Sequence, residues 1–229
     1  MYYNTQLETP FTCIIAGASG SGKTTLMHNI LRNKEGLFRV PPAKVFVYYS
    51  INQPIYDSWI RTGLVSEKQE GVPPLEELIE KIEPYKDIGG TCIVIDDQLH
   101  DINEQIEKIF TQVSHHYNCS VFFMTQNIFF RNARYRTMSL NTKYTFVMKY
   151  TKDIDQVELY AKRHSQYQMD FIMRSYMRAT RNPYSYLLFD FSQSCPDIIR
   201  LRSSLFPHEF PMITYVEGQV SRKKRKYLY

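Results

Sequence analysis

Residues 17–24 read Gly17-Ala18-Ser19-Gly20-Ser21-Gly22-Lys23-Thr24 and match the phosphate-loop pattern G-x-x-x-x-G-K-[ST] at every fixed position. The apolar run 11–16 precedes this loop and is predicted to be a buried strand. Residues 24–31 follow the loop with the pattern of a helix. An ordinary glycine-rich turn is the alternative, but it does not account for both flanks. The sequence therefore predicts a strand, a phosphate loop and a helix in succession.

This order of elements supplies an anion site, because consecutive backbone N–H groups at the start of a helix converge on a bound phosphate. The three glycines of the loop let the backbone bend and approach the phosphates without a clashing Cβ. Lys23 is expected to contact the β- and γ-phosphates, and the Thr24 hydroxyl is expected to bind Mg²⁺. We therefore predict that the residues from Gly17 to Thr25 bind ATP with Mg²⁺.

The composition of the chain limits the classes of protein to consider. Its 229 residues are 43% hydrophobic and carry a net charge of +5, which suits a main domain over residues 1–205 and a basic, mobile tail over 206–229. No apolar stretch approaches the ~20 residues of a membrane span, and the N-terminus lacks a secretory signal. The four cysteines show no zinc-ligand spacing. These features favour the reducing interior of a cell and no membrane partner.

Strand-like and helix-like segments alternate along the chain, which predicts an α/β fold with a mainly parallel sheet flanked by helices. Residues 51–72 fit a helix and a loop, and residues 184–190 and 198–201 fit a closing hairpin. The other expected strands are 11–16, 43–49, 91–95, 120–124 and 144–148. The other expected helices are 24–31, 75–82, 103–117 and, in two pieces, 153–176.

The strand expected at 91–95 ends in two carboxylates, Asp96 and Asp97. The carboxyl ends of parallel strands face the ligand crevice of an open α/β sheet. Asp96 is therefore expected to hold the hydration shell of Mg²⁺, and Asp97 to orient and deprotonate the attacking water. A simple turn is the alternative, but the pairing with the phosphate loop favours the catalytic interpretation.

Polar residues also follow the strand expected at 120–124. In phosphate-loop NTPases whose acidic strand is not next to the loop strand, an extra strand lies between the two, and a polar residue at its tip can sense the γ-phosphate. Thr125 and Gln126 both fit that role. A simple turn that ends the strand fits the spacing equally well.

The strand expected at 120–124 is followed by three arginines: Arg131, Arg134 and Arg136. An arginine that reaches the γ-phosphate of a neighbouring subunit would stabilise the charge of the transition state. A solvated basic face is the alternative, and for any single arginine it is the better interpretation.

Several segments together resemble a known family: the loop 17–24, Ile95-Asp96-Asp97, Thr125-Gln126-Asn127 and the Arg-Thr-x-Ser-Leu-Asn segment 136–141. They resemble the FtsK/HerA-type genome-packaging ATPases of double-stranded DNA viruses. The resemblance is closest to the packaging ATPases of Polinton/Maverick elements and adintoviruses, and more distant to the poxvirus packaging ATPase. Residues 49–57 are similar to a stretch that these proteins carry after the second strand.

The resemblance spans residues 11–150 and implies a RecA-like motor domain with the additional central strand (ASCE type). It implies a homo-oligomeric ring, a pentamer or a hexamer, with ATP bound between subunits. In such a ring Gln126 would be the sensor and Arg136 the arginine finger. Many relatives carry Glu after the acidic Asp, where this chain has Asp97, whose shorter side chain needs a closer approach to the water.

The hypothesis from the sequence is an ATP-hydrolysing double-stranded DNA translocase that packages a viral or viral-like genome into a capsid. Its partners would be DNA, further copies of the chain, and capsid or portal proteins at the intracellular site of virion assembly. The basic segment 222–226 fits DNA binding, portal docking, nuclear import or a solvated terminus. The rival hypotheses are a P-loop kinase of a nucleotide or other small molecule, and a nucleotide switch, against which the paired acids argue.

Overall fold

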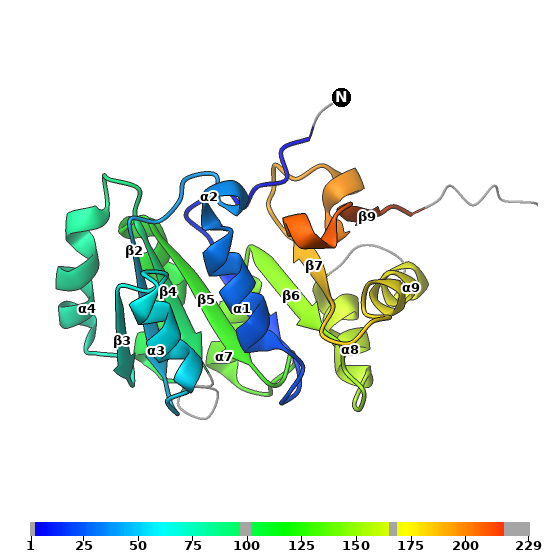
Figure 1. Ribbon diagram of the computed structural model, residues 1–229. Coiled ribbons are helices and arrows are strands. Elements are labelled where there is room, and N and C mark those ends of the chain that lie inside the picture. The colour runs from blue at the N-terminus through cyan, green and yellow to red at the C-terminus, as the bar shows by residue number, and fades with distance from the viewer. Residues whose placement is uncertain (1–2, 97–101, 165–168, 218–229) are drawn as a thin grey trace, which may run out of the picture.

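A mostly parallel sheet is the centre of the computed structural model, which describes residues 3–96, 102–164 and 169–217 (Figure 1). Its strands are β1 (Thr12–Ala16), β2 (Lys44–Tyr49), β3 (Glu67–Glu70), β4 (Thr91–Asp96), β5 (Cys119–Thr125), β6 (Tyr144–Met148), β7 (Tyr186–Asp190), β8 (Leu201–Ser203) and β9 (Ile213–Tyr215). They lie in the order β3-β2-β4-β5-β1-β6-β7-β8-β9. The strands from β3 to β6 are parallel, whereas β7, β8 and β9 each pair antiparallel with the strand before.

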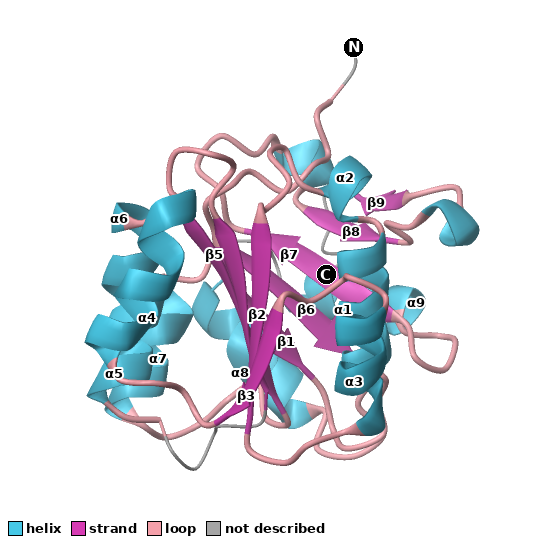
Figure 2. Cartoon of the chain, turned by 60° about the vertical axis from the view of Figure 1, so that its left-hand side comes forward, coloured by secondary structure: helices cyan, strands magenta, loops and turns pink. Residues whose placement is uncertain are grey.

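Helices cover both faces of this sheet (Figure 2). One face carries α1 (Lys23–Arg32), α2 (Lys34–Leu37) and α3 (Pro54–Arg61). The other carries α4 (Leu75–Ile82), the continuous helix α5-η3-α6 (Glu104–Lys108, Ile109–Val113, Ser114–His116), α7 (Ala133–Leu140), α8 (Asp155–His164) and α9 (Met169–Ala179). Short helical turns are η1 (Glu83–Tyr85), η4 (Asp197–Ile199) and η5 (Pro207–Glu209). Within the described ranges, no helix is long and apolar enough to cross a bilayer.

The central strands are apolar throughout because both of their faces are buried. Successive side chains of a strand point to opposite faces, so Cys13 and Ile15 of β1 join the core under α1, whereas Ile14 and Ala16 join the core under α7 and α8. Cys13 and Cys119 are buried as free thiols. Desolvation raises the pKa of the Cys119 thiol to about 12, so this side chain acts as a small hydrophobe.

The position of β5 fixes where the functional strand ends meet. This strand pairs with β1 on one side and with β4 on the other, with Ala16 opposite Thr125 and Asp96 opposite Met124. The carboxyl ends of β1, β5 and β4 therefore lie side by side at one edge of the sheet. The prediction of an additional strand between the loop strand and the acidic strand is confirmed.

The sequence predicted the bounds of two elements as they are observed, the helix 75–82 and the strand 144–148. It missed β3, which lies within the stretch expected as a helix and a loop. This strand forms the edge of the sheet, reads Glu-Lys-Gln-Glu and pairs only with β2 among the described strands. Charged residues are common on such edges because they discourage pairing with other chains, and they remove the apolar alternation on which the prediction depends.

The boundary expected between a main domain and a tail at residue 205 is also wrong. Phe206 is 2% exposed and packs into the core under α1, and β9 extends the sheet through pairing with β8. The fold therefore continues to at least Tyr215. The basic segment 222–226 lies outside the described residues.

A buried ion pair holds the antiparallel strands to the start of the chain. Arg202 of β8 is fully buried, and its Nη2 donates to Oδ2 of Asp190 on β7 at 2.6 Å. Its Nη1 donates to the carbonyl of Thr5 at 3.0 Å. Because a buried charge is costly without a partner, these contacts keep β7, β8 and the N-terminal segment in one arrangement.

Candidate active site

The loop 17–24 connects the end of β1 to the start of α1. Gly20 has a φ of 72° and Gly22 a φ of 98°, a left-handed conformation that side chains with a Cβ rarely adopt. Gly22 is the residue directly before the helix. The two glycines therefore turn the chain so that the loop meets the amino end of α1, where backbone N–H groups are free of intrahelical partners.

Position 17 requires a glycine because the loop passes very close to β6 there. Its N–H donates to the carbonyl of Thr125 at 3.1 Å, which ties the loop to β5. A Cβ at this position would lie 2.5 Å from Cβ of Met148 and 2.5 Å from Oγ of Ser21. The space beside the last residue of β6 is therefore too small for any side chain at position 17.

Two polar side chains of the loop point to an anion site. Nζ of Lys23 donates to the carbonyls of Gly17 at 2.6 Å and Ala18 at 3.2 Å, so the cation lies over the loop. Oγ of Ser21 is buried and has no hydrogen-bond partner among the described residues. A buried hydroxyl without a partner is costly, and a bound phosphate oxygen would supply the missing acceptor.

Lys23 borders a cavity of about 480 Å³ at the edge of the sheet where β1, β4 and β5 end. The loop and the first turn of α1 line it with Ser19, Gly20, Gly22, Lys23, Thr24 and Thr25. Other segments contribute Gln53, Asp96, Gln126 and Tyr184. The structure thus brings the loop, Asp96 and Gln126 together in one cavity, as the sequence predicted, and adds Gln53 and Tyr184.

Asp96, the last residue of β4, is 5% exposed. The hydroxyl of Tyr56 on α3 donates to its Oδ2, and Nε2 of Gln53 donates to the same oxygen at 3.4 Å. Tyr56 stacks on Tyr49 with the ring centroids 5.2 Å apart and is itself buried. The carboxylate is therefore held in place by the segment that follows β2.

The donor set fits a magnesium ion. The Thr24 hydroxyl and the Asp96 carboxylate line the same cavity, and Mg²⁺ prefers oxygen ligands with several of its waters retained. No group of three or more His, Cys, Asp or Glu side chains in the described ranges forms a metal site of its own. A site of one hydroxyl and one carboxylate is completed by phosphate oxygens rather than by further protein ligands.

The two sensor candidates have different surroundings. Thr125 is fully buried, and its Oγ1 donates to the carbonyl of Asn127 at 3.2 Å, so this hydroxyl belongs to the turn after β5. Gln126 lines the cavity, and its carbonyl accepts from the hydroxyl of Tyr150 at 2.9 Å. The geometry therefore favours Gln126.

None of the three arginine candidates lines the cavity. Nη1 of Arg134 donates to Oε2 of Glu107 on α5 at 2.9 Å, which gives it an intramolecular role. Arg131 and Arg136 are exposed, before and on α7. Asp97, the expected general base, lies outside the described residues.

Three residues of the site were missed by the sequence reasoning: Gln53, Tyr56 and Tyr184. The first two follow β2, whose carboxyl end lies next to that of β4, with Tyr49 opposite Asp96. The rule that located Asp96 could have located Gln53 as well. Tyr184 precedes β7, which runs antiparallel to β6, so its amino end reaches the same edge. No local signal in the sequence marks that reversal.

The chain is similar to a family of viral proteins and to solved NTPase structures. The family model described as Poxvirus A32 protein matches residues 1–188. The genome packaging NTPase B204 from Sulfolobus turreted icosahedral virus 2, solved in complex with sulfate, is 12% identical with a TM-score of 0.55, over 82% of this chain and 95% of that one. EssC (ATPases 2 and 3) from Geobacillus thermodenitrificans is 12% identical with a TM-score of 0.54, over 79% of this chain and 37% of that one.

At this level of identity the two structures show a shared P-loop ATPase fold, in agreement with the predicted fold class. No curated protein sequence matches the chain.

The close approach at Gly17 predicts the effect of a single added methyl group. Gly17→Ala should lower the free energy of unfolding by about 1–3 kcal/mol, because the new Cβ overlaps Met148 and the backbone of the loop must move. Gly36→Ala is the matched control, since a Cβ at Gly36 on α2 meets open space and should leave stability unchanged or raise it. Urea unfolding followed by circular dichroism measures both. Equal stability of the two variants would contradict the packing argument.

Proposed function

The chain belongs to the poxvirus A32 protein family, and on that premise we propose that it is a P-loop ATPase of the FtsK/HerA type that packages DNA. In this proposal a ring of identical subunits hydrolyses ATP and drives double-stranded DNA into a capsid. The observation that carries it is the single cavity shared by the loop 17–24, Asp96 and Gln126. Those groups come from three adjacent parallel strands, which bring the phosphate loop, an acidic residue and a polar residue together as ATP hydrolysis needs.

The residues of the cavity have different roles in ATP hydrolysis. The amides of the loop and Nζ of Lys23 bind the phosphates of ATP. The Thr24 hydroxyl and the Asp96 carboxylate would hold Mg²⁺, which neutralises charge that develops on the phosphate oxygens. Gln126 senses the γ-phosphate, and Asp97 orients the attacking water. Asp97 accepts the proton of that water.

The contacts of Asp96 supply a positioning element. The hydroxyl of Tyr56 and the amide of Gln53 both donate to Oδ2, so the carboxylate cannot rotate freely and its position depends on α3. Groups held by such hydrogen bonds keep the geometry that catalysis needs. A movement of α3 would therefore be felt directly at the metal site.

The placement of the arginines supports the proposal of a ring of subunits. Arg136 is exposed on α7 and away from the cavity of its own chain, so it is available to the nucleotide of a neighbour. Arg134 is engaged by Glu107. We infer that Arg136 is the arginine finger, in a homo-oligomeric pentamer or hexamer.

The DNA part of the proposal is supported by family and charge. The solved B204 protein is a genome packaging NTPase by its description, and the chain carries a net charge of +5. A motor that moves along any sequence grips phosphates rather than base edges. We propose that it acts with capsid or portal proteins at the intracellular site of virion assembly. The segment 222–226 would add DNA or portal contacts or nuclear import.

Lys23 supplies the cation that is proposed to bind the phosphates. Lys23→Ala should lower ATP turnover by about 100-fold or more, because it removes the charge that lies at the mouth of the loop. Release of inorganic phosphate measures turnover, and an unchanged thermal midpoint shows an intact fold. Lys86→Ala, which removes an exposed lysine before β4 at the opposite edge of the sheet, should have normal activity. Normal hydrolysis by Lys23→Ala would refute the site.

Arg136 is the proposed arginine finger. Arg136→Ala should lower turnover by about 1000-fold while nucleotide binding persists, because the arginine acts on the transition state of a neighbouring subunit. Mixing Arg136→Ala with Lys23→Ala subunits should recover part of the activity, since some interfaces then combine an intact cavity with an intact arginine. If nucleotide binding and turnover fall together, or if Arg131→Ala rather than Arg136→Ala abolishes turnover, the assignment is wrong.

A DNA motor and a kinase differ in their response to DNA. Double-stranded DNA of random sequence should stimulate ATP turnover, and the apparent affinity for DNA should fall steeply with salt, with a slope of about −0.9 per neutralised phosphate on logarithmic axes. Lys23→Ala should still bind DNA. ATP turnover that is indifferent to DNA but depends on a small-molecule acceptor would favour the kinase hypothesis instead.

A further inference from the structure

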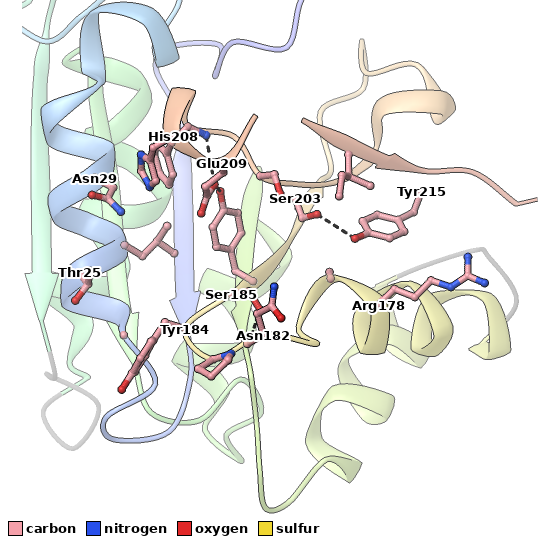
Figure 3. A pocket seen from close by; sticks show the side chains of 18 residues that line it. Thr25, Asn29, Arg178, Asn182, Tyr184, Ser185, Ser203, His208, Glu209 and Tyr215 are labelled. Atoms are coloured by element: carbon pink, nitrogen blue, oxygen red, sulfur yellow. Dashed lines mark hydrogen bonds between the residues drawn. The ribbon is translucent and has the colours of Figure 1, made fainter. Parts of the chain in front are cut away.

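A second cavity of about 470 Å³ adjoins the one that holds the phosphate loop (Figure 3). It lies between α1, which carries Thr25 and Asn29, and the C-terminal part of the fold, from α9 to β9. Gly22, Thr25 and Tyr184 line both cavities. A ligand whose phosphates occupy the loop can therefore extend past Tyr184 into the second space.

Tyr184 lies between the two cavities and has an unusual backbone conformation. Its φ is 62°, a left-handed conformation that is a genuine outlier for a bulky residue. Its side chain is 68% exposed although it is aromatic. A Cβ at Gly22 would lie 3.2 Å from Cδ1 of Tyr184, so the ring packs directly against the residue before α1. Strained residues of this kind persist where the surrounding structure fixes them, and they gather at ligand sites.

The turn that carries Tyr184 is fixed by its own hydrogen bonds. Oγ of Ser185 donates to the carbonyl of Asn182 at 2.6 Å, and Nζ of Lys149 donates to the carbonyl of Arg181 at 3.0 Å. Pro183 restricts the backbone between them. The turn therefore places Tyr184 beside the loop in the absence of a ligand. A ligand that stacks on its ring loses less free energy to ordering of the protein.

The remaining walls of the second cavity suit a nucleoside. Glu209 is already engaged, because its Oε2 accepts from the hydroxyl of Tyr186 at 2.8 Å. Ser203 and Tyr215 bond to each other at 3.0 Å. The side-chain amides of Asn29 and Asn182 line the space, and each offers a donor and an acceptor. A flat ring beside amide groups matches the flat face and the polar edge of a nucleobase.

We propose that this second cavity binds the base and ribose of the nucleotide whose phosphates occupy the loop 17–24, with the base stacked on Tyr184. This assignment rests on the proposed function, because the base and ribose belong to the ATP whose phosphates the loop is proposed to bind. It makes Tyr184 a binding residue that contacts the nucleoside and leaves the phosphates to the loop.

The test compares ADP with pyrophosphate, which carry a diphosphate with and without the nucleoside. Calorimetry in Mg²⁺ should show that the full chain binds ADP more tightly than pyrophosphate. Tyr184→Asn should weaken ADP binding by about 5-fold to 150-fold, the range for loss of a base stack, and leave pyrophosphate binding unchanged. Asparagine suits this variant because it tolerates the left-handed backbone. Tyr184→Phe should retain the affinity for ADP.

A control variant and the pattern of binding separate failure of the nucleoside site from failure of the proposed function. Tyr3→Ala removes an exposed tyrosine that lines neither cavity and should change neither affinity. If the two ligands bind equally, or if Tyr184→Asn weakens both alike or neither, the nucleoside site is wrong while the phosphate site stands. If neither ligand binds the unmodified chain, the proposed function falls and this inference with it.

Discussion

The parallel hydrogen-bond ladders that join β5 to β1 on one side and to β4 on the other are the constraint on which the site depends. Parallel strands in register end at one edge of a sheet, so the phosphate loop, Asp96 and Gln126 arrive together although the chain separates them widely. Both faces of these strands are buried, which makes a change of register costly. The distances within the site are therefore set by the backbone of the sheet.

The phosphate loop obtains its shape from glycines, which have no Cβ. Gly17 passes so close to Met148 that no Cβ fits, and Gly20 and Gly22 take conformations closed to most residues. The same edge accepts the segment after β2, whose Tyr56 donates to Asp96. The carboxylate of Asp96 is thus coupled to α3 on one face of the sheet, while Arg136, the proposed arginine finger, lies on α7 at the other face.

The antiparallel strands extend the site in another direction. Because β7 reverses the direction of β6, the turn before it lies at the edge where the parallel strands end. That turn places Tyr184 between two cavities, one lined by the phosphate loop and one lined by the C-terminal part of the fold. The buried pair of Arg202 and Asp190 stabilises this extension. Two adjoining cavities thus result from parts of the chain that are far apart in the sequence.

The sequence by itself determined the phosphate loop, the acid at the end of β4, the α/β class and the family, because each depends on residues adjacent in the chain. Local patterns also located most strands, yet not β3 or β9, whose short polar or exposed sequences form strands only through pairing with a neighbour. Only the tertiary structure decided that Gln126 rather than Thr125 lines the cavity, that Tyr56 and Gln53 hold Asp96, and that Tyr184 joins the site. Those decisions depend on strand order and strand direction, which bring together residues far apart in the chain.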